Sequence, residues 1–81
     1  EMSMKGIGIG DVIEDKSGNR SRVEEIIRNP KSDTDGVPGI VKHRTIDSGV
    51  HVSTTFSSSL GTPFVDWRQY KVISKAKDPE A

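Results

Sequence analysis

The side chains best suited to bind a charged ligand lie in an alternating stretch between positions 42 and 55. Lys42 and Arg44 supply cations, and His51 adds an imidazole. Ser53 and Thr55 add hydroxyl groups on the same alternation. Cations beside hydroxyl donors suit a phosphate or a carboxylate. The same pattern is also typical of a solvated strand whose charges protect a sheet edge, so the sequence allows either interpretation.

A second group of such residues lies near the C-terminal end. Between positions 68 and 77 the chain carries four cations and no anion. If the sheet closes into a barrel, Arg68 and Lys71 approach the cations at 42 and 44, and Trp67 and Tyr70 can stack on a base. The alternative is that Trp67 belongs to the core and Tyr70 is half-buried. The predicted ligand-binding set is Lys42, Arg44, His51, Trp67, Arg68, Tyr70 and Lys71.

Patterns that carry catalysis or bind a metal are missing from the sequence. There is no Cys to act as nucleophile or metal ligand, and there is no G-x-S-x-G motif. The serines at 57–59 have no neighbouring His, and the carboxylate pairs at 14–15 and 24–25 point to opposite faces if each lies in a strand. The glycines at 6–10 lack the long helix of a dinucleotide fingerprint. We expect a non-enzymatic protein with no metal and no cofactor.

Charge and composition narrow the range of partners. The 81 residues include 12 basic and 12 acidic ones, so the formal net charge is zero. A balanced chain is not a general polyanion binder. No apolar run can span a bilayer and no secretory signal is visible, so we expect a cytoplasmic location and no membrane partner. We expect another protein as partner, docked by a strand edge or a loop, with a nucleic acid or nucleotide as the alternative. The sequence also allows a homo-oligomer.

The apolar residues favour a mainly β fold in one domain. Val and Ile number 8 each, whereas Leu occurs once. β-Branched side chains lose freedom in a helix but fit a pleated sheet. A chain this short has a marginal core, and closing the sheet into a barrel removes exposed edges. The predicted divisions are a start region, or a remnant of cloning, at 1–5, a β-barrel domain at 6–74 and a frayed charged tail at 75–81.

Local patterns place most of the strands. Residues 11–15 and 70–74 each predict a short strand, and residues 16–19 predict a turn between strands. Residues 20–28 are ambiguous, because their apolar side chains fit either one face of a helix or an alternating strand. We favour the strand, since the helix would have only about two turns and would nucleate poorly.

The hairpin from Ile40 to Phe56 has a register that can be derived. A two-residue loop at Ser48-Gly49 pairs Val41 with Phe56. One face then holds Val41, His43, Thr45, Val50, Val52, Thr54 and Phe56, and the other holds Lys42, Arg44, Ile46, His51, Ser53 and Thr55. A four-residue loop keeps these faces, whereas a three-residue loop buries two cations beside the apolar row and is rejected. His43 and His51 then point to opposite faces and cannot share a metal ion.

The end of the chain resembles the end of SH3-like barrels. Residues 63–73 combine a proline, a short aromatic turn at 66–69 and an apolar strand, and Gly10-Asp11-Val12 is similar to the opening of small SH3-like and KOW-type barrels. The resemblance implies a small five-stranded barrel with a single 3₁₀ turn before the last strand. It also implies a non-catalytic binding module, and small phage and plasmid accessory proteins often look similar. With four aromatic residues and a polar loop at 29–38, a proline-rich ligand is not expected.

Overall fold

The computed structural model describes residues 4–28, 39–57 and 65–76, and it is mainly β as predicted. The strands are β1 (Val12–Asp15), β2 (Arg20–Ile27), β3 (Ile40–Thr45), β4 (His51–Ser57), β5 (Val65–Asp66) and β6 (Tyr70–Ser74). Two single 3₁₀ turns are present, η1 (Met4–Gly6) and η2 (Trp67–Gln69). The predicted turn before the last strand is therefore confirmed. The predicted count of five strands was wrong, because the two residues of β5 form a sixth.

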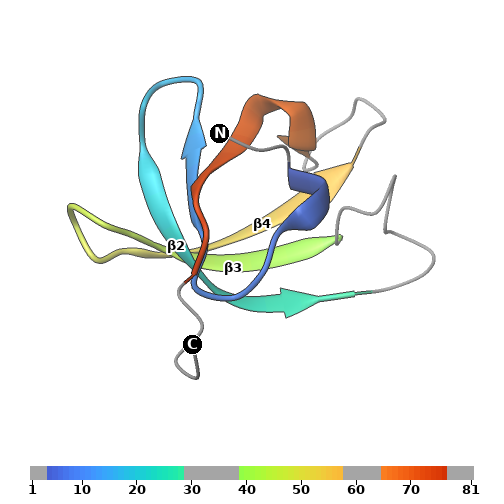
Figure 1. The fold of residues 1–81 in the computed structure, drawn as a ribbon, viewed down its shortest axis with the longest axis horizontal. Coiled ribbons are helices and arrows are strands. Elements are labelled where there is room, and N and C mark those ends of the chain that lie inside the picture. The colour runs from blue at the N-terminus through green and yellow to red at the C-terminus, as the bar shows by residue number, and fades with distance from the viewer. Residues whose placement is uncertain (1–3, 29–38, 58–64, 77–81) are drawn as a thin grey trace.

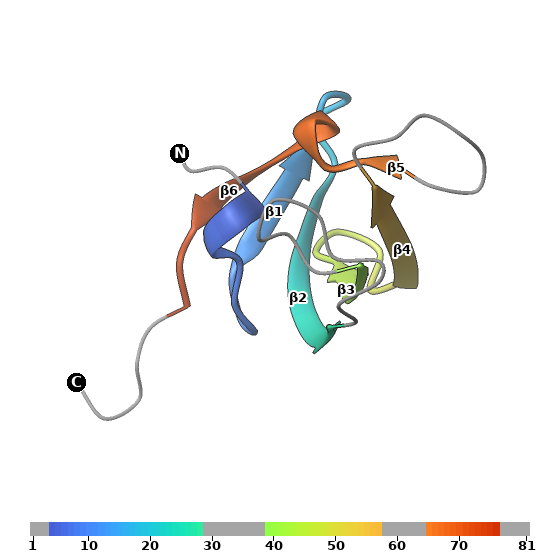
Figure 2. The same cartoon turned by 90° about the vertical axis from the view of Figure 1, so that its right-hand side faces the viewer.

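The six strands form one curled sheet in the order β5-β4-β3-β2-β1-β6. Neighbouring strands are antiparallel, except that β5 runs parallel to β4. The sheet bends into a half-barrel (Figure 1). Because η2 connects β5 directly to β6, it links the two outermost strands of the sheet across the top of the half-barrel (Figure 2).

The ambiguous stretch from 20 to 28 forms strand β2, with a bulge that changes its alternation. The register against β3 shifts between Val23 and Glu25, so Glu24 is the extra residue. Strict alternation would place Glu25 on the same face as Val23. The bulge instead brings Ile26 opposite Val41, where it packs against the core. A single inserted residue therefore keeps the Glu25 carboxylate out of the interior.

The hairpin of β3 and β4 has the predicted faces but a longer loop. The Thr45 amide donates to the Val50 carbonyl at 2.9 Å, which closes a four-residue loop rather than the predicted two-residue one. Gly49 has a φ of 69°, and its amide donates to the Thr45 carbonyl at 2.8 Å. Lys42 consequently pairs with Ser53 instead of Thr55. The shift is two residues, so no side chain changes face.

The core lies on the concave face of the sheet and reaches beyond the predicted domain boundary. Its buried apolar members are Met4, Ile7, Ile13, Val23, Val41, Phe56 and Val72. Met4 is fully buried, so part of the predicted start region belongs to the packed unit. The long Met4 side chain supplies apolar area that a small β core lacks.

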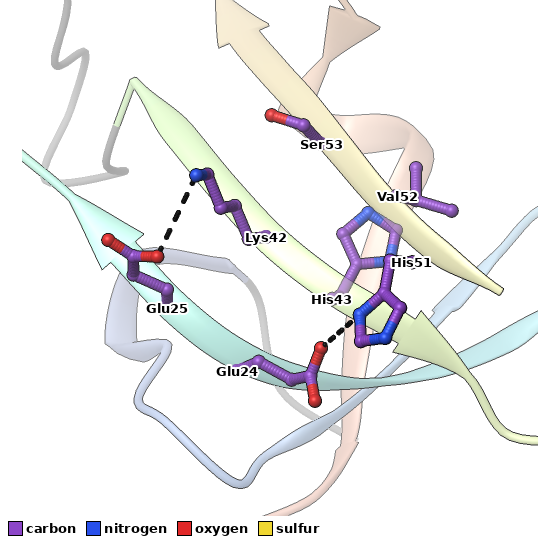
Figure 3. A pocket seen from close by; sticks show the side chains of 7 residues that line it. All are labelled: Glu24, Glu25, Lys42, His43, His51, Val52 and Ser53. Carbon is purple, nitrogen blue, oxygen red and sulfur yellow. Dashed lines mark hydrogen bonds and ion pairs between the residues drawn. The ribbon is translucent and has the colours of Figure 1, made fainter. Parts of the chain in front are cut away.

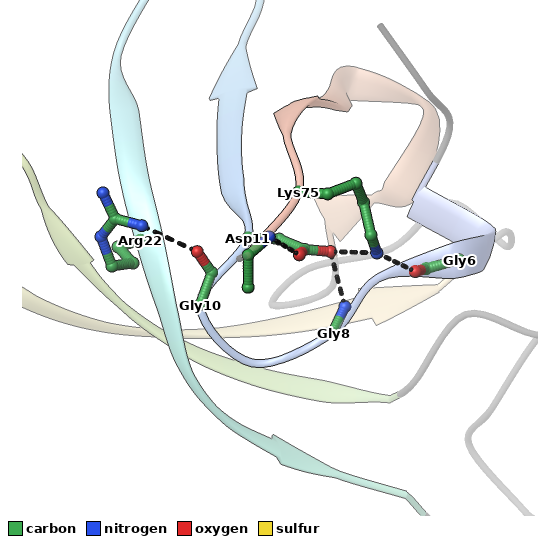
Figure 4. Close-up of polar contacts among 7 residues, drawn as sticks. Gly6, Gly8, Gly10, Asp11, Arg22 and Lys75 are labelled. Carbon is green, nitrogen blue, oxygen red and sulfur yellow. Dashed lines mark hydrogen bonds and ion pairs between the residues drawn. The ribbon is translucent and has the colours of Figure 1, made fainter. Parts of the chain in front are cut away.

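A buried carboxylate ties the two ends of the described chain together (Figure 4). Asp11 accepts hydrogen bonds from the Gly8 amide at 2.8 Å, the Ala76 amide at 2.8 Å and the Lys75 ammonium at 2.6 Å. Lys75 also donates to the Gly6 carbonyl at 2.7 Å. Burial acts to raise the pKa of Asp11, but these donors outweigh it and the pKa lies below its ordinary value. Lys75 and Ala76, the first two residues of the predicted frayed tail, are therefore held in place by hydrogen bonds. Residues 77–81 lie outside the described part of the chain.

Candidate functional site

The convex face of β2, β3 and β4 carries a connected group of charged side chains. Arg44 on β3 lies directly opposite His51 on β4, and its Nη2 is 2.9 Å from His51 Nε2. His51 Nδ1 is 2.9 Å from a Glu24 carboxylate oxygen, and Arg44 Nε is 3.5 Å from the other oxygen. A guanidinium can only donate, so Nε2 of His51 accepts from Arg44, and the N–H at Nδ1 donates to the Glu24 carboxylate. Arg44 and Glu24 together therefore set the tautomer and the orientation of the imidazole.

The β2 bulge places a second carboxylate on this face. Lys42 lies 3.8 Å from Glu25, next to the Glu24 group (Figure 3). The prediction that Glu24 and Glu25 point to opposite faces was wrong, because the bulge breaks the alternation between them. A groove of about 390 Å³ runs over these side chains. Its lining is Glu24, Glu25, Lys42, His43, His51, Val52 and Ser53. We call this surface the outer-face groove.

Arg22 belongs to the same convex face, although it was not among the predicted site residues. It lies directly opposite Arg44 in the register of β2 and β3. Its Nη1 donates to the Gly10 carbonyl at 2.8 Å (Figure 4). Like charges directly opposite each other are unfavourable in a sheet. The signal was present in the sequence, since an inward Val23 requires Arg22 to point outward.

The other predicted cations are held elsewhere. Lys71 on β6 lies 3.4 Å from Glu14, which also pairs with Arg20 at 2.9 Å. The Arg20 hydrogen bond is the main reason that the pKa of Glu14 lies below its ordinary value. Arg68 binds both carboxylate oxygens of Asp66 at 2.9 and 2.7 Å, which lowers the pKa of Asp66 to about 2. The structure thus brings together Lys42, Arg44 and His51. Arg68 instead pairs with Asp66 of its own segment, and Lys71 pairs with Glu14 across strands β6 and β1.

The two predicted aromatic residues pack toward the concave side. Tyr70 makes edge contacts with Phe56 at 5.3 Å and with His43 at 6.3 Å between ring centroids. Trp67 packs against the core, and the Lys5 ammonium lies 5.6 Å from its ring centre. Stacking of both aromatics beside the cations of the outer-face groove is therefore not what the structure shows.

The open edge of β4 adjoins the outer-face groove. The Val50 carbonyl and the Phe56 amide both bond toward the β3 side of the hairpin. In an antiparallel ladder alternate residues bond to the same neighbour, so the main-chain groups of His51 and Ser53 face away from β3. Strand β5 pairs with β4 only at Phe56 and Ser57. Within the described ranges, no strand pairs with the edge at His51 and Ser53.

The described residues contain neither a metal-binding cluster nor a membrane-spanning helix. His43 and His51 lie on opposite faces as predicted, and no group of three or more His, Cys, Asp or Glu gathers there as a metal site would require. No helix in that part of the chain is long and apolar enough to cross a membrane. Comparison with known proteins finds no family model, curated protein or solved structure that matches the chain significantly.

Proposed function

We propose that this chain is a non-catalytic binding module that acts in the cytoplasm through protein–protein interaction. The observation that carries the proposal is the open edge of β4 at His51 and Ser53. An extended segment of another protein can add to such an edge as a further strand. Main-chain hydrogen bonds supply affinity in this mode, and neighbouring side chains supply specificity.

The charge pairing of the convex face also supports a protein partner. Arg44 and His51 share Glu24, and Lys42 lies near Glu25. A polyanion prefers a field of one sign, whereas this face carries both signs side by side. Mixed charges beside an open strand edge suit the register and specificity of a protein interface.

The architecture supports a place among SH3-like small barrels. The half-barrel, the η2 turn and the short final strand β6 follow the order that the sequence resemblance implied. Members of that class are usually binding modules rather than enzymes. A small adaptor, inhibitor or phage-type accessory protein is the kind of protein that this function describes.

Capture from a source lysate tests the proposal when it is combined with an edge variant. Ser53→Pro removes an amide that points away from β3, so it blocks strand addition without breaking a bond between β3 and β4. Ser53→Ala is the matched control. We expect nuclease-resistant capture of a protein by wild type and Ser53→Ala, and its loss in a folded Ser53→Pro. Equal capture by both variants contradicts docking at this edge.

A second candidate function is binding of a nucleic acid, a nucleotide or a related anion. The specific observation in its favour is the direct opposition of Arg22 and Arg44 on the face that also carries Lys42 and His51. An anion between the two guanidinium groups would relieve their repulsion. This candidate predicts capture that nuclease abolishes and affinity that falls steeply with salt. Such a result would make anion binding, and not protein–protein interaction, the main function.

A further inference from the structure

A second pocket lies on the concave face, beside the buried apolar cluster against which its lining residue Tyr70 packs. Its volume is about 350 Å³. The walls come from the turn between β1 and β2, the β3–β4 hairpin and the first residue of β6. The lining is Asp15, Asn19, Ser21, His43, Thr45, Ser48, Val50, Val52 and Tyr70. We call it the inner pocket.

Several polar residues in or beside the inner pocket are buried, which is unusual for so small a core. Ser21, His43 and Thr54 are 6%, 3% and 6% exposed. His43 Nε2 lies 2.7 Å from the Thr54 hydroxyl, but His43 Nδ1 has no hydrogen-bond partner among the described residues. A buried polar atom without a partner destabilises the fold. Polar groups that a marginal domain keeps at such a cost often mark a functional site.

The lining of the inner pocket carries a negative charge. Asp15 is the one carboxylate in its lining within the described part of the chain. The turn holds that carboxylate in place, because it accepts from the Ser17 amide at 2.9 Å and from the Asn19 amide at 3.0 Å. Burial, and after it the charge of Asp15, raise the pKa of Tyr70. The Asp15 carboxylate therefore lies close enough to the Tyr70 phenol to influence its ionisation.

The remaining lining suits a positively charged group on an apolar stem. Ser21, Thr45 and Tyr70 offer hydroxyl oxygens as acceptors, and Val50 and Val52 offer apolar surface. Long cationic side chains bury their methylene groups against such surface while the charged end keeps polar partners. An anion would be repelled by Asp15, and a purely apolar group would leave the hydroxyls without partners.

We propose that the inner pocket binds a guanidinium or ammonium group, with the Asp15 carboxylate as its charge partner and the Tyr70 ring and hydroxyl as its wall. The group belongs either to a lysine or arginine side chain of a protein or to a free small amine. The pocket shares Val52 with strand β4, but its charge partner Asp15 lies on β1 and Tyr70 lies on β6. The cation probes therefore test this site separately from strand addition at the edge of β4.

Titration of the wild-type protein with a matched pair of probes tests the charge requirement without any variant. N-acetylarginine amide carries the guanidinium, and N-acetylcitrulline amide is its neutral isostere. We expect the arginine probe to shift the NMR signals of Asp15, Ser21 and Tyr70, and the citrulline probe to leave them unmoved. Equal shifts from both probes, or no shifts from either, overturn the proposal.

Variants on the two faces then locate the site. Asp15→Asn keeps an oxygen for the turn but removes the charge, so we expect affinity for the arginine probe to fall about tenfold. Glu24→Gln removes a carboxylate of the outer-face groove and should leave this affinity unchanged. Loss in Glu24→Gln, or full binding by a folded Asp15→Asn, contradicts the assignment.

Tyr70 provides an optical readout, because it is the sole tyrosine of the chain. A guanidinium bound beside the phenol should lower the pKa of Tyr70 toward its ordinary value. Absorbance titration with and without the arginine probe measures this change, and an unmoved titration counts against the site. An arginine-containing peptide that binds more tightly than the free probe identifies a protein side chain as the source. Equal affinity identifies a free small cation.

Discussion

Polar side chains on the two faces of strand β3 have opposite surroundings. On the convex face, Lys42 and Arg44 are exposed and lie close to carboxylates of β2. On the concave face, Val41 is fully buried and His43 is nearly so, and one ring nitrogen of His43 has no partner among the described residues. Water and mobile counter-charges satisfy polar groups outside at little cost, whereas an interior group depends on fixed partners. A polar residue is therefore stronger evidence of a function inside than outside.

The largest contrast between the faces should appear when side chains are truncated. Phe56 is 2% exposed and belongs to the core, so Phe56→Ala should lower the free energy of unfolding by about 3–5 kcal/mol. Lys42→Ala on the outer side of the neighbouring strand should change it by less than about 1 kcal/mol. Urea unfolding followed by Trp67 fluorescence measures both.

Phe56→Ala removes much of the stability of a small domain and can leave it unfolded, so a milder variant completes the comparison. Ile13 is fully buried, and Ile13→Val should cost about 0.5–1.5 kcal/mol. A larger loss in Lys42→Ala than in Ile13→Val would mean that the convex face, and not the concave one, holds the fold together.

The parts of this comparison that the sequence predicted follow from local rules. Alternation in the hairpin assigns the faces of Lys42 and Val41, because only one parity keeps the cations out of the core. The same parity survives the longer loop around Gly49, since a shift of two residues leaves each side chain on its face. A β-branched composition likewise made the sheet predictable.

The features that escaped prediction depend on distant or single residues. Asp11 bonds Lys75 across 64 positions of sequence, and no local pattern signals such a contact. The bulge at Glu24 is one inserted residue, and the two residues of β5 are too few to show a period. For the candidate site the bulge mattered most, because it makes Glu25 point to the same face as Glu24.

A smaller contrast should appear in the acid sensitivity contributed by His43. Burial lowers the pKa of His43 below its ordinary value near 6.5. The unfolded chain therefore takes up this proton at higher pH than the folded one, and stability falls as the pH drops below about 6.5. The loss levels off once the pH is below the folded pKa of His43. Chemical unfolding across this pH range measures the dependence.

The two histidines provide matched variants for this measurement. His43→Gln should remove the loss of stability between neutral and mildly acidic pH, because no buried imidazole remains to be protonated. His51→Gln should keep that loss, since it leaves the buried ring in place. The carboxylates with lowered pKa, such as Asp66, add a separate loss only at lower pH. An unchanged pH profile in a folded His43→Gln argues against this origin.

The smallest expected effect concerns the shared carboxylate of the convex face. Glu24→Gln keeps an acceptor for His51 but removes the charge that Arg44 faces at 3.5 Å. Exposed pairs of this kind contribute about 0.2–1 kcal/mol and are screened by salt, so the loss should be small and should shrink at high salt. Glu25→Gln is the matched control, with a longer 3.8 Å contact to Lys42 and a smaller expected loss. Urea unfolding at low and high salt measures both variants. A salt-independent loss as large as that of Phe56→Ala would show that Glu24 supports the fold itself, and the contrast between the faces would then be lost.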